Sequence, residues 1–166
     1  PRPLLYRLSC PARRTGAPAG DRPGSATADR APEIRRIAVL GGGAWGSALA
    51  LTAARAGREA IVWARDADIV AAIAEGRGNP TYLPGIAFDA KVAATTDLAF
   101  ALADVDAALL VTPAQTTRAM GAAIAPLAQP GLPVVLCAKG IERDTGKLLS
   151  EIAADILPQA PIAALS

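Results

Sequence analysis

The sequence of 166 residues contains no histidine. This absence excludes a Ser-His-Asp or Cys-His nucleophile system, a zinc site with histidine ligands, and any reaction that needs a histidine general base. Cysteine is scarce too, and Cys10 and Cys137 fit neither a metal-binding spacing nor a disulfide framework. A reducing compartment suits this composition, and the apolar run around Cys137 predicts a small buried side chain there.

Long apolar runs are also missing, so no segment approaches the roughly 18–20 residues of a membrane-spanning helix. Aromatic residues make up 4% of the chain, apolar residues 52% and charged residues 19%, which is typical of one globular domain. The net charge of +2 is uneven, because residues 1–36 carry eight Arg and three acidic residues and the rest is net negative. Nucleic-acid binding by the folded part is therefore not expected.

The chain divides into two parts near residue 36. Residues 1–35 are rich in Pro, Gly and Arg and lack a lasting period, which predicts a disordered basic extension. From residue 36 to residue 166, strands are predicted at 37–40, 60–63, 92–94, 107–111, 134–137 and 162–165, and helices at 45–56, after Asp66, and at 97–102, 113–127 and 147–157. This alternation predicts an α/β fold, a Rossmann-type doubly wound parallel sheet that is incomplete at its C-terminal end.

Local signals add detail to the helices. Leu49, Ala53 and Ala56 are expected to share one buried face of the first helix. Asp66 is expected to cap the second helix, because its carboxylate can accept a hydrogen bond from a backbone amide of the first turn. Pro113 suits the first turn of the fourth helix, where a backbone N–H is not needed.

A glycine-rich loop follows the first predicted strand. Gly41, Gly43 and Gly46 satisfy the pattern G-x-G-x-x-G. In this pattern the first glycine permits a tight turn, the second lets a pyrophosphate approach the backbone, and the third lets the helix pack closely on the sheet. A strand before the pattern and a helix after it are the context in which it indicates dinucleotide binding rather than an ordinary glycine turn.

The end of the second predicted strand bears on the choice of dinucleotide. Sites specific for NAD(H) usually carry Asp or Glu there, which binds the ribose hydroxyls. In this sequence Arg65 and Asp66 follow the strand. Arg65 is suited to stack on adenine and to pair with a 2′-phosphate, whereas Asp66 either accepts a ribose hydroxyl or only caps the next helix. The sequence favours NADP(H), with NAD(H) as the alternative.

Five motifs follow one another along the chain: GGGAWGSALA, VWARD, NPTYLPG, VTPAQ and CAKGIE. In this order and spacing, residues 36–166 resemble the bacterial NAD(P)-dependent glycerol-3-phosphate dehydrogenases. The resemblance implies a cytoplasmic oxidoreductase that interconverts dihydroxyacetone phosphate and sn-glycerol 3-phosphate for phospholipid synthesis. It implies no metal ligand, and it is consistent with a homodimer of the full-length protein.

The resemblance also implies cofactor contacts. Ala44 and Trp45 of the glycine loop match family positions that contact the cofactor, as do Arg65 with Asp66 beside it and Tyr82 of YLPG. The residues by themselves leave other interpretations open. Trp45 is equally suited to fill a gap between helix and sheet, and Tyr82 to brace a loop.

Lys139 of KGIE matches a family lysine that contacts both cofactor and substrate. At the carboxyl end of a strand, a lysine is suited to pair with a phosphate or to polarise a carbonyl, unless it is merely solvated. In the family the proton-transferring lysine lies in a helical substrate domain, beyond the position of Ser166. No catalytic residue is therefore expected in residues 1–166, and the chain is expected to be inactive alone.

Two other functions stay open at this point. One is another NADP-dependent reductase, with the layout of a ketopantoate reductase or a hydroxyacid dehydrogenase, because one fold serves many substrates. The other is a nucleotide-binding module without catalysis. The order of YLPG and KGIE favours the glycerol-3-phosphate dehydrogenases over the first. The second is disfavoured because a module of this kind is expected to cover its sheet edge with polar residues, whereas residues 162–165 are an apolar run.

Overall fold

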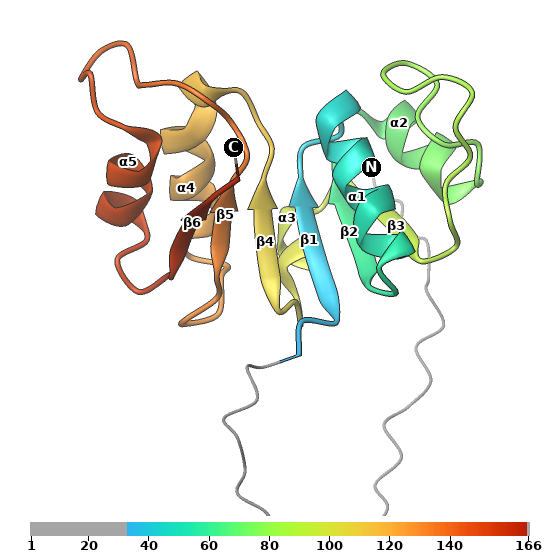
Figure 1. The fold of residues 1–166 in the computed structure, drawn as a ribbon, viewed down its shortest axis with the longest axis horizontal. Helices are drawn as coiled ribbons and strands as arrows, with labels where there is room; N and C mark the ends of the chain where they lie inside the picture. The colour runs from blue at the N-terminus through green and yellow to red at the C-terminus, as the bar shows by residue number, and fades with distance from the viewer. Residues whose placement is uncertain (1–32, 166) are drawn as a thin grey trace, which may run out of the picture.

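A computed structural model describes residues 33–165, so nearly all of the extension predicted over residues 1–35 lies outside the described range, as does Cys10. Within that range six strands form one sheet: β1 (Arg36–Leu40), β2 (Glu59–Trp63), β3 (Val92–Thr95), β4 (Ala107–Leu110), β5 (Val134–Leu136) and β6 (Ile162–Ala164). The helices are α1 (Ala44–Arg55), α2 (Ala67–Ala74), α3 (Leu98–Leu102), the 3-10 turn η1 (Ala114–Thr116), α4 (Thr117–Ile124) and α5 (Leu149–Ile156). Strands and helices alternate along the chain (Figure 1), which confirms the predicted order.

All neighbouring strands run parallel, in the order β3-β2-β1-β4-β5-β6. The strand order reverses between β1 and β4, which are adjacent in the sheet although β2 and β3 lie between them in the sequence. Loops on the two sides of such a switch point diverge and open a crevice at the carboxyl ends of the strands. The Rossmann-type doubly wound sheet is confirmed, and this crevice is the expected place for a ligand.

Each face of the sheet has its own hydrophobic core, because successive side chains of a strand point to opposite faces. In β1, Ala38 and Leu40 join the core that includes residues of α3, α4 and α5, whereas Val39 joins the core formed with α1 and α2. All three side chains are fully buried. Burying an aliphatic side chain of the size of Val or Leu stabilises the fold by roughly 1.5–3 kcal/mol. The buried strands therefore form a rigid floor for the crevice.

Helix α1 buries a different face from the one predicted. Ala53 is buried as expected, but Leu49 is only half-buried and Ala56 is exposed. The buried face carries small residues such as Ser47 and Ala50. Apolar spacing gave the wrong face because alanine is abundant on every side of this helix, so the pattern has little contrast. The small residues let α1 lie close to the sheet.

The predicted helix starts are partly confirmed. Asp66 is the N-cap of α2, and its carboxylate accepts a hydrogen bond from the amide of Asp68 at 2.9 Å. Pro113 precedes the 3-10 turn η1, so α4 begins only at Thr117 and the prediction of an α-helical first turn at Pro113 is wrong. Across residues 33–165, the helices are too short or too polar to traverse a bilayer.

Candidate cofactor-binding site

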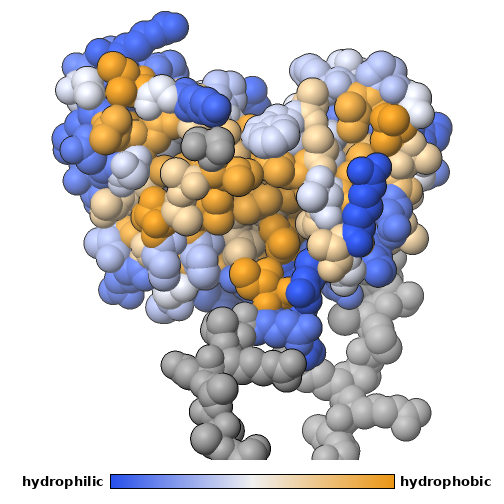
Figure 2. Space-filling model, in the orientation of Figure 1, coloured by the Kyte–Doolittle hydropathy of each residue, from blue (hydrophilic) through white to orange (hydrophobic). Residues whose placement is uncertain are grey.

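A cleft of about 830 Å³ opens at the carboxyl ends of the central strands. Figure 2 shows the hollow at the top of the view, between the two lobes of the molecule. The lining comes from the glycine loop, the end of β2, the loop after α2 and the ends of β4 and β5: Gly41, Gly42, Gly43, Ala44, Trp45, Gly46, Trp63, Ala64, Arg65, Asp66, Ile69, Tyr82, Val111, Thr112, Pro113, Cys137 and Ala138. Of the residues predicted to contact cofactor, all except Lys139 lie in this lining.

Of the three glycines in the G-x-G-x-x-G pattern, the fold itself requires two. A Cβ atom on Gly41 would lie 2.8 Å from the carbonyl oxygen of Val111, and the φ angle there is +141°, in the region that favours glycine. A Cβ atom on Gly46 would overlap the carbonyl oxygen of Gly41. These two glycines therefore let β1, α1 and the end of β4 approach one another.

Gly43 differs, because no atom lies within 4 Å of the position that its Cβ would take. Its φ of −78° and ψ of −177° are ordinary extended angles, so the fold does not need glycine there. Gly43 is also the N-cap of α1, and no side chain caps this helix. Free space beside uncapped helix amides fits a phosphate, so the residues present are suited to the pyrophosphate of a dinucleotide.

Asn79 ties the glycine loop to the loop that carries Tyr82. Its side chain is fully buried, and its amide nitrogen donates hydrogen bonds to the carbonyl oxygen of Gly42 and to Oγ of Ser47, both at 2.8 Å. Its amide oxygen accepts the backbone N–H of Tyr82 at 3.1 Å. Sequence reasoning missed Asn79, whose signal is a single polar residue before Pro80 in the motif NPTYLPG.

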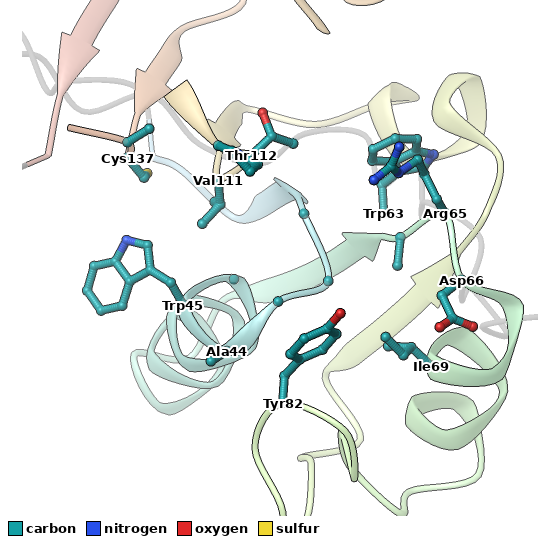
Figure 3. Close-up of a pocket in the computed structure, with 17 residues that line it drawn as sticks. Ala44, Trp45, Trp63, Arg65, Asp66, Ile69, Tyr82, Val111, Thr112 and Cys137 are labelled. Atoms are coloured by element: carbon teal, nitrogen blue, oxygen red, sulfur yellow. The ribbon is translucent and has the colours of Figure 1, made fainter. Parts of the chain in front are cut away.

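The two ends of the cleft differ in chemistry (Figure 3). Arg65 and Asp66 lie at one end, after β2, whereas Trp45 lies at the other, on the side of Cys137. Arg65 is exposed, and its guanidinium forms no ion pair with another described residue. Asp66 caps α2, and its exposed side chain still lines the cleft. The β2 end is therefore the one suited to a ribose or its phosphate.

Two aromatic side chains are exposed at the cleft. Trp45 and Tyr82 are each 52% exposed. The alternative that Trp45 fills a gap between helix and sheet is therefore wrong, and its ring extends outward from the start of α1 (Figure 3). The ring of Tyr82 extends toward the glycine loop. Exposed aromatic faces beside an anion site offer stacking surfaces for a planar ring.

The ends of β4 and β5 form the remaining wall of the cleft. Cys137 is buried, as predicted, and burial raises the pKa of its thiol. A thiol of this kind is a poor nucleophile at neutral pH. Thr112 also belongs to this wall. Among residues 33–165, its Oγ1 is the one buried side-chain nitrogen or oxygen atom without a hydrogen-bond partner. Pro113 lies next to Thr112 in the lining, so this residue both forms part of the cleft wall and precedes the turn η1.

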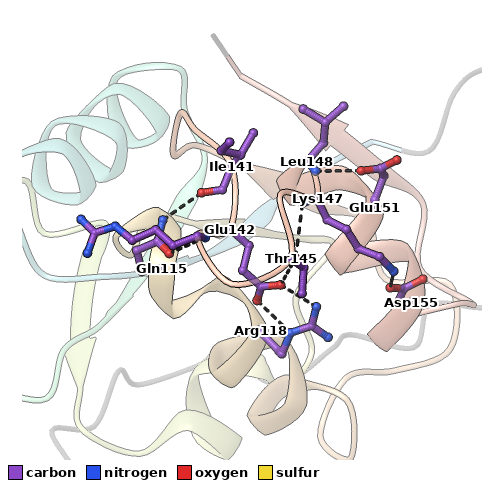
Figure 4. A network of polar contacts seen from close by, with 10 residues as sticks. Gln115, Arg118, Ile141, Glu142, Thr145, Lys147, Leu148, Glu151 and Asp155 are labelled. Carbon is purple, nitrogen blue, oxygen red and sulfur yellow. Dashed lines mark hydrogen bonds and ion pairs between the residues drawn. The ribbon is translucent and has the colours of Figure 1, made fainter.

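Lys139 follows Ala138, the last lining residue, but does not line the cleft itself. Its side chain is exposed and has no ion-pair partner in the described part of the chain. The loop that it begins, residues 139–147, is held by polar contacts from η1 and α4 (Figure 4). Sequence reasoning also missed these contacts.

Comparison with known proteins places the chain in a family. The family model described as NAD-dependent glycerol-3-phosphate dehydrogenase N-terminus matches residues 36–166. Glycerol-3-phosphate dehydrogenase (NAD(P)+) of Mesorhizobium japonicum is 56% identical over 131 residues, and the enzyme of the same name from Paramagnetospirillum magneticum is 52% identical over 133 residues. These alignments cover 79% and 80% of this chain but 38% and 48% of the relatives, so the chain spans less than half of their length.

Solved structures agree with the family model. The glycerol-3-phosphate dehydrogenase of Coxiella burnetii is 32% identical with a TM-score of 0.73, over 79% of this chain and 40% of that one. A ketopantoate reductase from Ralstonia eutropha is 24% identical with a TM-score of 0.61, over 78% of this chain and 40% of that one, a likeness that shows the fold alone. Together with the glycine loop and the strand order, the match over residues 36–166 shows that the chain belongs to the NAD-dependent glycerol-3-phosphate dehydrogenase family and contains its N-terminal part.

Proposed function

We propose that the cleft binds a nicotinamide dinucleotide, with the pyrophosphate over Gly43 at the N-terminus of α1. The observation that carries this proposal is the space at Gly43, where the fold does not require glycine and no side chain caps the helix. The sheet places this space beside the switch point between β1 and β4. The positive end of the helix dipole and the backbone N–H groups both favour a phosphate there.

We propose NADP(H) as the preferred cofactor, with Arg65 pairing with the 2′-phosphate. Arg65 is exposed at the β2 end of the cleft and has no ion-pair partner among residues 33–165, so its guanidinium is available. Asp66 already accepts a hydrogen bond from the amide of Asp68. A guanidinium matches the geometry of a phosphate in a bidentate pair, which an ammonium does not.

Titration of the chain with NADPH and with NADH tests this assignment. Arg65→Glu is expected to weaken NADPH binding at least tenfold and to change NADH binding little, because only NADPH carries the 2′-phosphate. Arg55→Glu makes the same charge change at the far end of α1 and serves as the matched control. Equal losses for both cofactors in Arg65→Glu would contradict a contact to the 2′-phosphate.

We propose that the chain serves the reaction for which its relatives are named, the NAD(P)-dependent dehydrogenation of glycerol 3-phosphate. The product would be dihydroxyacetone phosphate, and the setting cytoplasmic phospholipid synthesis, as the sequence resemblance implies. A bound nicotinamide supplies the hydride transfer. Lys139 comes two residues after Cys137, which lies at the Trp45 end of the cleft, away from Arg65. There it is suited to bind the phosphate of the substrate or to stabilise negative charge on a carbonyl oxygen. Proton transfer is not assigned to any residue from 33 to 165.

The role of Lys139 is testable by NMR, which detects weak binding. In the presence of NADPH, sn-glycerol 3-phosphate is expected to bind the unchanged chain at least tenfold more tightly than Lys139→Met. Lys91→Met removes an exposed lysine outside the lining and is the control. Equal binding to all three proteins would show that Lys139 does not contact the substrate.

A further inference from the structure

A set of polar side chains holds the loop of residues 139–147, and the proposed ligand contacts do not use them (Figure 4). We call Gln115, Arg118, Glu142 and Thr145 the loop clamp. Gln115 belongs to η1 and Arg118 to α4, whereas Glu142 and Thr145 belong to the loop itself. The clamp joins the segment after β4 to the segment after β5.

Gln115 binds the backbone of the loop in both directions. Its amide nitrogen donates a hydrogen bond to the carbonyl oxygen of Ile141 at 2.8 Å, and its amide oxygen accepts the backbone N–H of Arg143 at 3.1 Å. A side-chain amide that both donates and accepts fixes the distance and the rotation of a strand-like segment. The backbone on each side of Glu142 is therefore fixed.

Glu142 is the buried centre of the clamp. Its side chain is 11% exposed, and its two carboxylate oxygens accept hydrogen bonds from Nε and a terminal nitrogen of Arg118, each at 2.8 Å. Thr145 Oγ1 donates a further hydrogen bond at 2.6 Å. These donors lower the pKa of Glu142 to about 2, so the carboxylate is ionised across the physiological range. A bidentate pair of this geometry is directional as well as strong.

The clamp has a consequence for Lys139, which precedes Glu142 by three residues. An ionised carboxylate this close along the chain is a natural partner for a lysine ammonium. Arg118 and Thr145 bind both oxygens of Glu142, and Lys139 forms no ion pair within the described range. Gly140 lies between them with φ of +131°, and the position of its Cβ is 3.5 Å from Ala114, so the loop passes close to η1. The start of the loop is thereby held while the ammonium is left free.

We propose that Glu142 is a positioning residue: bound by Arg118, and with Gln115 holding the backbone on each side of it, Glu142 fixes the start of the loop so that the ammonium of Lys139 stays unpaired beside the cleft, where it meets an anionic group of the ligand. This inference rests on the proposed function, which gives Lys139 its ligand. Glu142 itself is given no ligand contact, because its carboxylate is bound by Arg118 and Thr145.

The experiment uses the whole chain and four variants. Glu142→Gln keeps the shape of the side chain and removes its charge, Lys139→Ala removes the ammonium, and the double variant combines them. Asp155→Asn is the matched control, because it breaks the exposed ion pair between Lys147 and Asp155, 2.6 Å long, near the other end of the loop. Hydrogen exchange measures the backbone amides of Glu142 and Arg143, which donate hydrogen bonds to the carbonyl oxygen of Lys147 and to the side chain of Gln115. NMR titration in the presence of NADPH measures the affinity for sn-glycerol 3-phosphate.

The expected result has two parts. In Glu142→Gln, the amides of Glu142 and Arg143 exchange at least tenfold faster and sn-glycerol 3-phosphate binds about three- to tenfold more weakly, whereas Asp155→Asn changes neither quantity. In the Lys139→Ala background, Glu142→Gln causes no further loss of affinity, because the residue it positions is gone. An affinity loss of the same size in both backgrounds, or an unchanged affinity in Glu142→Gln, would overturn the proposal.

The outcome also separates this proposal from the proposed function. If Lys139→Ala leaves binding unchanged, the ligand contact of Lys139 is wrong and the positioning role falls with it. If Lys139→Ala weakens binding but Glu142→Gln does not, only the positioning role is wrong. Should Glu142→Gln fail to fold, Gln115→Ala removes the other half of the clamp and carries the same expectations.

Discussion

Asn79 Nδ2 donates a hydrogen bond to the carbonyl oxygen of Gly42 at 2.8 Å, across 37 residues of sequence. The same nitrogen donates to Oγ of Ser47, so one buried amide joins the glycine loop, the first turn of α1 and the loop that carries Tyr82. Buried polar groups that lose their partners cost more than the net value of a hydrogen bond. The shape of the glycine loop therefore depends on a residue outside it.

We expect Asn79→Ala to lower the free energy of unfolding by about 2–4 kcal/mol, because it leaves two acceptors and one donor unpaired and opens a cavity. Ser47→Ala removes a single partner and should cost about 1 kcal/mol. Urea unfolding followed by fluorescence measures both. Equal losses in the two variants would show that Asn79 does not hold the loop through this network.

Gly43 and Gly46 give a matched pair of variants. Gly43→Ala should leave stability unchanged or raise it by up to about 1 kcal/mol, because the space is free and alanine restricts the unfolded chain. The same change should weaken NADPH binding at least tenfold, since the new methyl group occupies the place proposed for the pyrophosphate. Gly46→Ala should instead destabilise the fold by about 3 kcal/mol or more, because the backbone must move. Full NADPH binding by Gly43→Ala would contradict the proposed site.

Thr112 carries a buried hydroxyl without a partner among residues 33–165. Thr112→Val replaces that hydroxyl by a methyl group of similar shape and keeps the branched Cβ. We expect a gain in unfolding free energy of about 1 kcal/mol, because an unpaired buried polar group is removed. Thr112→Ser keeps the hydroxyl and should be less stable than the unchanged chain. A loss of stability in Thr112→Val would indicate that the hydroxyl has a partner in solution.

The acid stability of the chain should depend on Glu142, whose pKa in the folded chain is about 2 against an ordinary value of 4.5. A lowered pKa means that the carboxylate contributes its full stabilisation above pH 4.5 and loses it as the pH falls through about 2. Glu142→Gln should therefore melt at a lower temperature than the unchanged chain at neutral pH, and the difference should shrink as the pH falls between those values.

Asp106 provides the comparison for this prediction. Its pKa is also lowered, because the backbone N–H groups of Arg36 and Arg35 donate to its carboxylate. The fall in melting temperature between neutral and acid pH should therefore be smaller in Glu142→Gln than in the unchanged chain, but not zero. It should be smaller still in the double variant Glu142→Gln with Asp106→Asn. A constant difference in melting temperature across the acid range would contradict the role given to Glu142.

Most of the fold was predictable because its signals are local. The central strands are short apolar runs that are buried on both faces, as Ile61 and Val62 of β2 illustrate. Asp66 and Asp97 begin helices by accepting hydrogen bonds from amides two or three residues ahead. Signals of this kind lie within a few neighbouring residues. The glycine loop was predictable for the same reason.

The residues that hold the loops were not predictable, because their partners are distant in the sequence. Asn79 and Gly42 are 37 residues apart, and Arg118 and Glu142 are 24 residues apart. A single polar residue in a loop leaves no periodic pattern, so burial at that position becomes visible only in the packed structure. The face of α1 was wrong for a related reason, since alanine does not distinguish a buried side from an exposed one.

The central place of β1 has a consequence for how the chain is made. β1 meets β2 early, because Ile37 pairs with Ala60, but its other neighbour is β4, where Ile37 pairs with Ala107, 70 residues along the chain. Pairing over such a separation is slow compared with local structure. A nascent chain leaves the ribosome N-terminus first, so its glycine loop emerges before Val111, against whose backbone Gly41 packs, has been synthesised. Affinity for the dinucleotide should therefore arise late in synthesis.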